Sequence, residues 1–138
     1  MMFCAKICGL SKEAEVETAI NYGAAFCGFI LNWPKSHRYI NVNQLDNFKK
    51  IKKKDCKFVG VLVNPTTEEI KKFNHTILDY FQLHGEETIE EINEIKNLTK
   101  KKIIKTIKIN KSENLINRDY DYYQKIVDIF LFDSTALK

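Results

Sequence analysis

The chain has 138 residues, which suffices for one domain with a hydrophobic core and is too short for two ordinary domains. Its hydrophobic content of 44% and charged content of 29% are typical of a soluble globular protein, and no apolar run is long enough to cross a membrane. The net charge of +4 comes mainly from lysines within residues 49–54 and 100–102, and acidic segments between them predict a solvated face rather than a nucleic-acid-binding surface.

The first predicted element is a short buried strand within residues 3–9, which ends on Cys8 and is followed by Gly9. Alternation along a strand puts Cys4, Lys6 and Cys8 on one face. Burying an ammonium is costly without an anion nearby, and a neighbouring cation stabilises a thiolate. The alternative is that Cys8 is a small buried hydrophobe, and this segment alone favours that alternative.

The helix that follows is predicted over residues 11–22, with Ser11 as N-cap and Gly23 as the stop. A capping box, Thr66 to Glu69, starts a later helix. The other predicted helices cover residues 41–53, 87–98 and 113–125. The other predicted strands cover residues 26–31, 58–63, 80–84, 103–107 and 129–132. We expect one domain over residues 1–138.

Alternating apolar strands and amphipathic helices predict an α/β fold with a parallel sheet and right-handed crossovers. Two architectures fit this order: a doubly wound open sheet, or part of a (β/α)8 TIM barrel. The chain has no glycine-rich nucleotide-binding motif, which weakens the open sheet. Polar residues at strand ends favour the barrel, where chemistry takes place at that rim. They are Cys8, Asn64, His84 and Asp133.

Four cysteines show no C-x-x-C pair and no histidine at zinc-finger spacing, so we expect neither a disulfide framework nor a metal site. Cys4, Cys27 and Cys56 are interpreted as packing residues. Free thiols fit a reducing compartment, and the N-terminal residues lack the pattern of a secretory signal. The sequence therefore predicts a cytoplasmic protein.

Six segments together resemble one enzyme family. They are Lys6-Ile7-Cys8-Gly9, Gly28-Phe29, Pro34-Lys35-Ser36-x-Arg38-Tyr39-Ile40, Val59-Gly60-Val61-Leu62-Val63-Asn64, Gln82-Leu83-His84-Gly85 and Leu131-Phe132-Asp133. In this order and spacing, over the whole chain, they are similar to phosphoribosylanthranilate isomerase of tryptophan biosynthesis.

The resemblance implies a (β/α)8 barrel that performs an Amadori rearrangement on a small phosphosugar–anthranilate substrate, without metal or organic cofactor. It implies that Cys8 is the general base and Asp133 the general acid. Opening the sugar ring needs a proton on the ring oxygen, and a thiolate can then remove the acidified C2′ proton. Lys6 would stabilise that thiolate or would have a structural role under the rim, and both interpretations stay open.

Three further residues are expected in the site. Arg38 matches the family position that binds the anthranilate carboxylate, and its planar guanidinium suits that anion. Gln82 and His84 share a face of their predicted strand, so both should point into the barrel mouth and line the pocket.

The family continues past Asp133 into two more strands with phosphate-binding loops, so this chain is expected to hold six of eight β/α units. Open apolar edges would then favour self-association or a partner, and the chain alone would be inactive or barely active. Two alternatives remain: a partial barrel without catalysis that acts by association with another chain, and another phosphosugar barrel enzyme. We expect no nucleic-acid and no membrane partner.

Overall fold

The computed structural model describes residues 3–109 and 119–134, and these residues form one curved parallel sheet flanked by helices. The sheet has six strands in the order β1-β2-β3-β4-β5-β6. Their bounds are β1 Lys6–Cys8, β2 Phe26–Ile30, β3 Lys57–Leu62, β4 Tyr80–Leu83, β5 Lys102–Ile109 and β6 Ile129–Ser134.

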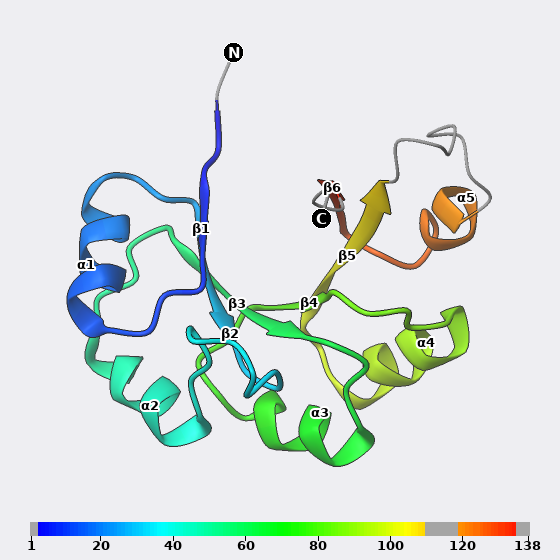
Figure 1. Ribbon diagram of the computed structural model, residues 1–138, viewed down its shortest axis with the longest axis horizontal. Helices are drawn as coiled ribbons and strands as arrows, with labels where there is room; N and C mark the ends of the chain where they lie inside the picture. Colours follow the sequence, from blue (N-terminus) through cyan, green and yellow to red (C-terminus); the bar gives the residue numbers. More distant parts are fainter. Residues whose placement is uncertain (1–2, 110–118, 135–138) are drawn as a thin grey trace.

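The helices lie on the outside of the curved sheet, and β1 and β6 lie at its two ends (Figure 1). The helix bounds are α1 Glu13–Asn21, α2 Val42–Asn47, α3 Thr67–Asn74, α4 Ile89–Leu98 and α5 Asp119–Tyr123, and a 3-10 turn covers Phe48–Lys50. The predicted helix over residues 113–125 is described only from residue 119, and the rest of it lies outside the described residues.

Each strand pairs in parallel with the next strand along the chain. A doubly wound sheet has a point where the strand order reverses, and this sheet has no such point among its described strands. The sequential order is that of consecutive units of a (β/α)8 barrel, so the barrel prediction is confirmed and the open-sheet alternative is not.

Capping boxes begin three of the helices. The side chains of Asn41, Thr66 and Thr88 each accept a hydrogen bond from the backbone N–H three residues later. Helix α1 differs from the prediction, because its N-cap is Lys12 rather than Ser11. The carboxylate of Glu15 accepts the backbone N–H groups of both residues, at 2.9 and 3.1 Å, so this side chain replaces the serine hydroxyl as the cap.

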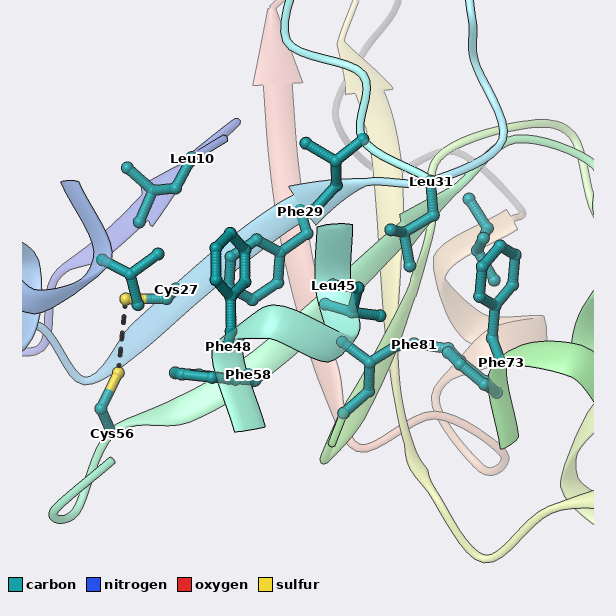
Figure 2. Packing of buried hydrophobic residues seen from close by; sticks show 14 of the residues in the cluster. Leu10, Cys27, Phe29, Leu31, Leu45, Phe48, Cys56, Phe58, Phe73 and Phe81 are labelled. Carbon is teal, nitrogen blue, oxygen red and sulfur yellow. Dashed lines mark hydrogen bonds between the residues drawn. The ribbon is translucent and has the colours of Figure 1, made fainter. Parts of the chain in front are cut away.

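The main core lies between the sheet and helices α1 to α4, and aromatic rings fill its centre (Figure 2). The ring of Phe29 on β2 packs against Phe48 and Phe58, with centroids 5.2 Å apart in both pairs. Cys27 and Cys56 are buried free thiols with their sulfurs 3.5 Å apart. Both are packing residues, as predicted, whereas Cys4 is exposed and that prediction is wrong.

The two ends of the sheet are much less covered than its centre. Strand β1 was expected to be buried, but Ile7 is 42% exposed, because β1 pairs with β2 alone among the described strands. Phe132 on β6 is 52% exposed. Among the described residues, no helix has the length and apolar character needed to span a membrane.

Candidate functional site

A cavity of about 620 Å³ lies at the carboxyl ends of the strands. Residues from all six strands or their carboxyl ends, together with the loop after β2, surround it. The lining residues are Cys8, Ile30, Trp33, Ser36, Arg38, Val61, Val63, Gln82, His84, Lys108 and Asp133. The cavity therefore brings together five of the six predicted site residues.

Arg38 reaches the end of β1 from the loop after β2. Its Nη1 donates a hydrogen bond to the carbonyl oxygen of Cys8, at 3.2 Å. Gly9 makes this approach possible: its φ is +78°, and a Cβ there would lie 2.7 Å from Arg38 Nη1. Because Arg38 itself is exposed, its other guanidinium N–H groups can bind a ligand.

Lys6 is the sixth predicted residue, and it is not among the described residues that line the cavity. It lies next to the site, however. A Cβ on Gly28 would lie 3.0 Å from Lys6 Nζ and 3.1 Å from Cys8 Sγ, so the ammonium and the thiol flank the same point on β2. The shared face predicted from strand alternation is thus confirmed, and Lys6 lies behind the thiol rather than against the ligand space.

Gln82 and His84 both point into the cavity from β4 and its end, as alternation predicts. Gln82 is 2% exposed, and its Oε1 has no hydrogen-bond partner among the described residues. Burial lowers the pKa of His84 below its usual value, although the charge of Asp133 opposes this effect. His84 is therefore a neutral imidazole near neutral pH.

Asp133 lies within β6 rather than just after it. Its Oδ2 is 3.7 Å from Nε2 of His84, and its side chain is 50% exposed. Lys108 is its register partner on β5 and also lines the cavity. The thiol of Cys8, the carboxyl of Asp133 and the imidazole of His84 thus surround one space. The cations Arg38 and Lys108 line the same space, and this arrangement suits acid–base chemistry on a small anionic ligand. The described residues contain no cluster of ligands that could hold a metal ion.

Two features of this site were not predicted from the sequence. Thr106 on β5 is 3% exposed, and its hydroxyl lies 3.1 Å from His84 Nδ1. Lys108 also went unassigned. Both follow Ile104 at two-residue spacing, so strand alternation could have placed them on the cavity face.

A buried ion pair supports the turn after β4. Lys105 Nζ lies 2.8 Å from Glu87 Oε2 and donates to the carbonyl of Gly85, also at 2.8 Å. Burial by itself would raise the pKa of Glu87, but the hydrogen bond and charge of Lys105, together with the amide of Asn64, hold it below its usual value. This pair fixes the turn that directly follows His84.

Asn64 was expected at the reactive rim. The structure instead places it between two turns: its Oδ1 accepts the N–H of Glu86 at 2.8 Å, and its own N–H donates to Glu87 at 2.9 Å. It is absent from the described cavity lining. Asn64 has φ +43°, a conformation that asparagine adopts more readily than most residues. Its role here is to hold two neighbouring turns together.

Comparison with known proteins gives a consistent result. The family model for N-(5′-phosphoribosyl)anthranilate (PRA) isomerase matches residues 5–138. An N-(5′-phosphoribosyl)anthranilate isomerase of Staphylococcus haemolyticus is 34% identical over 133 residues, which are 95% of this chain and 62% of that protein. One of Sulfurihydrogenibium is 34% identical over 110 residues, which are 80% of this chain and 51% of that protein. The chain thus spans less than two thirds of these relatives.

Solved structures give the same match. A phosphoribosyl anthranilate isomerase in complex with reduced 1-(o-carboxyphenylamino)-1-deoxyribulose 5-phosphate is 28% identical, with a TM-score of 0.79 over 97% of this chain and 66% of that one. The enzyme of Thermotoga maritima is 27% identical, with a TM-score of 0.80 over 99% of this chain and 64% of that one.

Proposed function

This chain belongs to the N-(5′-phosphoribosyl)anthranilate isomerase family, and we propose that its cavity is the acid–base part of an isomerase active site. The proposed reaction is the Amadori rearrangement of N-(5′-phosphoribosyl)anthranilate to 1-(2-carboxyphenylamino)-1-deoxyribulose 5-phosphate, a step of tryptophan biosynthesis. Acid–base groups are sufficient for it, and no metal or organic cofactor is proposed. The ligand of the first solved structure above supports this substrate class.

Asp133 and Cys8 take the two proton-transfer roles. The carboxylic acid of Asp133 gives its proton to the ring oxygen of the sugar, the C1′–O bond breaks, and the anthranilate nitrogen becomes an iminium. The thiolate of Cys8 then removes the proton from C2′, and the C2′–H electron pair neutralises the iminium. The resulting enol becomes the ketone when its hydroxyl proton leaves and C1′ gains a proton. Each such group is worth about 10²–10⁴-fold in rate.

The other predicted residues bind the substrate or support the two proton-transfer groups. Arg38 pairs with the anthranilate carboxylate, because a planar guanidinium matches a planar anion. His84 supplies a hydrogen bond to the sugar, and Gln82 lines the cavity beside it. Lys6 supports Cys8 from its place beside the thiol. A cytoplasmic location and the absence of nucleic-acid and membrane partners stay predictions from the sequence.

One observation carries this proposal: Cys8 at the end of the first strand and Asp133 in the sixth line the same cavity. The test is rescue of a tryptophan auxotroph that lacks this isomerase. The chain is expressed alone and fused to strands seven and eight of the Staphylococcus haemolyticus relative, which the family resemblance places after the sixth unit. We expect rescue by the fusion, and little or none by the chain alone.

Single substitutions in the fusion assign the roles. Cys8→Ala and Asp133→Asn should each abolish rescue. Cys4→Ala is the matched control, since Cys4 is an exposed cysteine two positions from Lys6 and should be dispensable. Normal growth with either Cys8→Ala or Asp133→Asn would refute the assigned roles.

A second candidate function is association through the open ends of the sheet. Ile7 and Phe132 are 42% and 52% exposed on β1 and β6, and exposed apolar edges of this kind tend to pair with other chains. An apolar hollow of about 590 Å³ between β1 and α1 adds to this surface. Sedimentation velocity of the chain, compared with an Ile7→Lys, Phe132→Lys variant, tests this candidate. A monomeric wild-type chain at every concentration would exclude self-association.

A further inference from the structure

Three side chains of β4 and β5 form a triangle of hydrogen-bonding atoms behind the cavity. The hydroxyl of Thr106 lies 3.1 Å from Nδ1 of His84 and 3.3 Å from Nε2 of Gln82. Nε2 of Gln82 lies 3.3 Å from the same Nδ1. Gln82 and Thr106 are 2% and 3% exposed, so water does not compete for these groups. None of the roles proposed above uses Thr106.

The donors of this triangle determine which nitrogen of His84 carries the proton. Nε2 of Gln82 can only donate, so the oxygen of Thr106 accepts one of its hydrogens. Nε2 of Gln82 also lies 3.3 Å from Nδ1 of His84, and a protonated Nδ1 would place two N–H donors against each other there. An unprotonated Nδ1 accepts from the Thr106 hydroxyl as well, and the imidazole proton is then on Nε2, which faces Oδ2 of Asp133 at 3.7 Å.

We propose that Thr106 is a positioning residue that holds His84 in its neutral Nε2–H tautomer, so that an imidazole N–H meets the carboxyl of Asp133. This inference rests on the proposed function, in which Asp133 donates a proton. A cationic imidazolium beside Asp133 would stabilise the carboxylate and make that proton harder to keep. A neutral N–H orients the carboxyl without adding a full charge.

The surroundings of His84 support a neutral ring. Burial is the largest effect and lowers its pKa, and Lys108 and Lys105 also lower it, while Asp133 and Glu87 act in the opposite direction. The hydrogen bond from Thr106 adds to this effect, because a lone pair that already accepts a hydrogen bond is less available to a proton. Burial thus keeps the ring neutral, and Thr106 sets the direction of its N–H.

Nuclear magnetic resonance of ¹⁵N-histidine-labelled chain tests the tautomer, because protonated and unprotonated ring nitrogens have well-separated ¹⁵N shifts. The chain has three histidines, and the signals lost in His84→Asn identify the ring in question. Wild type should show a protonated Nε2. Thr106→Val, which keeps the shape and removes the hydroxyl, should shift a large fraction of His84 to the Nδ1–H form. Thr106→Ser should restore the wild-type pattern.

The matched control is Gln82→Met, which removes the other donor and leaves Thr106 in place. The remaining Thr106 hydroxyl should still hold most of His84 in the Nε2–H tautomer. The proposal is overturned if wild type carries its proton on Nδ1, if Thr106→Val keeps the wild-type tautomer, or if Gln82→Met shifts the tautomer as far as Thr106→Val does. Circular dichroism shows whether each variant folds, and the wild-type and Thr106→Ser spectra test the assignment even if Thr106→Val does not fold.

A kinetic readout in the rescuing fusion connects the tautomer with catalysis. Thr106→Val should lower kcat about 10-fold with little change in KM, since a positioning group acts through another residue and should contribute less than the roughly 10²-fold or more of a group that transfers the proton itself. Thr106→Ser should recover kcat. The ¹⁵N measurement needs no substrate, so a wrong tautomer overturns this inference alone. Rescue that survives loss of Cys8 or Asp133 overturns the proposed function instead.

Discussion

Gly28 provides the space on β2 in which two side chains of β1 lie. A methyl group at this position would stand 3.0 Å from the ammonium of Lys6 and 3.1 Å from the sulfur of Cys8. Gly28→Ala should therefore displace the ammonium and the thiol, and it should also cost some stability, because the methyl group would lie 3.3 Å from the backbone Cα of Cys8. We expect slower alkylation of Cys8 by iodoacetamide in a Cys4→Ser background. An unchanged rate would show that the thiol does not depend on its place beside Lys6.

Arg38 gives a second prediction for a single residue. Its guanidinium holds the carbonyl of Cys8 with one N–H and has others for a ligand carboxylate. Arg38→Lys keeps the charge but loses the planar fork, so KM should rise about 10-fold while kcat changes less. Steady-state kinetics of the rescuing fusion measure this. Lys35→Arg, in the same exposed loop, is the control and should leave both constants unchanged.

The sequence predicted well, for a physical reason, which side chains would line the cavity. Strand alternation and strand ends are local properties, so Cys8, Gln82, His84 and Asp133 could be assigned to one rim before any coordinates. Thr106 was missed because one threonine in an apolar strand is equally well explained by β propensity. The same alternation placed Lys6 on the face of Cys8, but could not show that its ammonium lies behind the thiol.

At the scale of elements, the ion pair of Lys105 and Glu87 joins β5 to the turn after β4. Both side chains are almost fully buried, at 3% and 1% exposure. Lys105→Met should cost about 3–5 kcal/mol of unfolding free energy, because Glu87 would keep a buried charge without its partner. The double variant Lys105→Met, Glu87→Gln should recover part of this loss. Urea unfolding measures all three proteins.

The exposed pair of Lys49 and Asp46 is the control for this prediction. Its atoms are 2.9 Å apart, but its side chains are 55% and 41% exposed. Lys49→Met should change the unfolding free energy by less than about 1 kcal/mol. Equal losses for Lys49→Met and Lys105→Met would mean that burial does not set the strength of the Lys105 pair.

Helix positions were predicted better than helix ends. Thr66 and Glu69 form their capping box as expected, and the analogous box of Thr88 and Glu91 shifts the start of α4 to Ile89. For α1, the sequence offered Ser11 as the N-cap, but the carboxylate of Glu15 accepts the backbone N–H groups of Ser11 and Lys12 instead. Sequence patterns identify candidate caps, but the path of the chain after β1 decides which one is used. Lys105 lies in a largely apolar strand, so the sequence could have predicted a buried anionic partner for it, which the structure shows to be Glu87.

At the scale of the whole molecule, acid should destabilise the fold through groups whose pKa is lowered. The pKa of Glu87 is held below its unfolded value near 4.5, so its contribution is present above that pH and is lost as the pH falls through the folded value. The pKa of His84 is also below its unfolded value near 6.5, so the unfolded chain binds that proton first. Both effects make stability fall as the pH is lowered.

Urea unfolding at a series of pH values between neutral and acidic measures this trend. The double variant Lys105→Met, Glu87→Met lacks the buried pair and should show a smaller loss of stability at pH values below about 4.5 than wild type. Near neutral pH, the change of its unfolding free energy with pH should match that of wild type. Parallel curves over the whole acidic range would show that Glu87 does not contribute to the acid sensitivity.

The bridge formed by Asn64, Glu87 and Lys105 has a consequence for recombination among relatives. The three residues come from three successive β/α units, so these units cannot be exchanged independently between relatives. A hybrid protein with its crossover between α4 and β5 takes Glu87 from one parent and Lys105 from the other. It leaves a buried charge without its partner unless both parents carry Asn64, Glu87 and Lys105 at these positions. Crossovers placed before β3 or after β5 keep all three residues from one parent. Libraries of hybrids with these crossovers should contain a larger fraction of folded proteins.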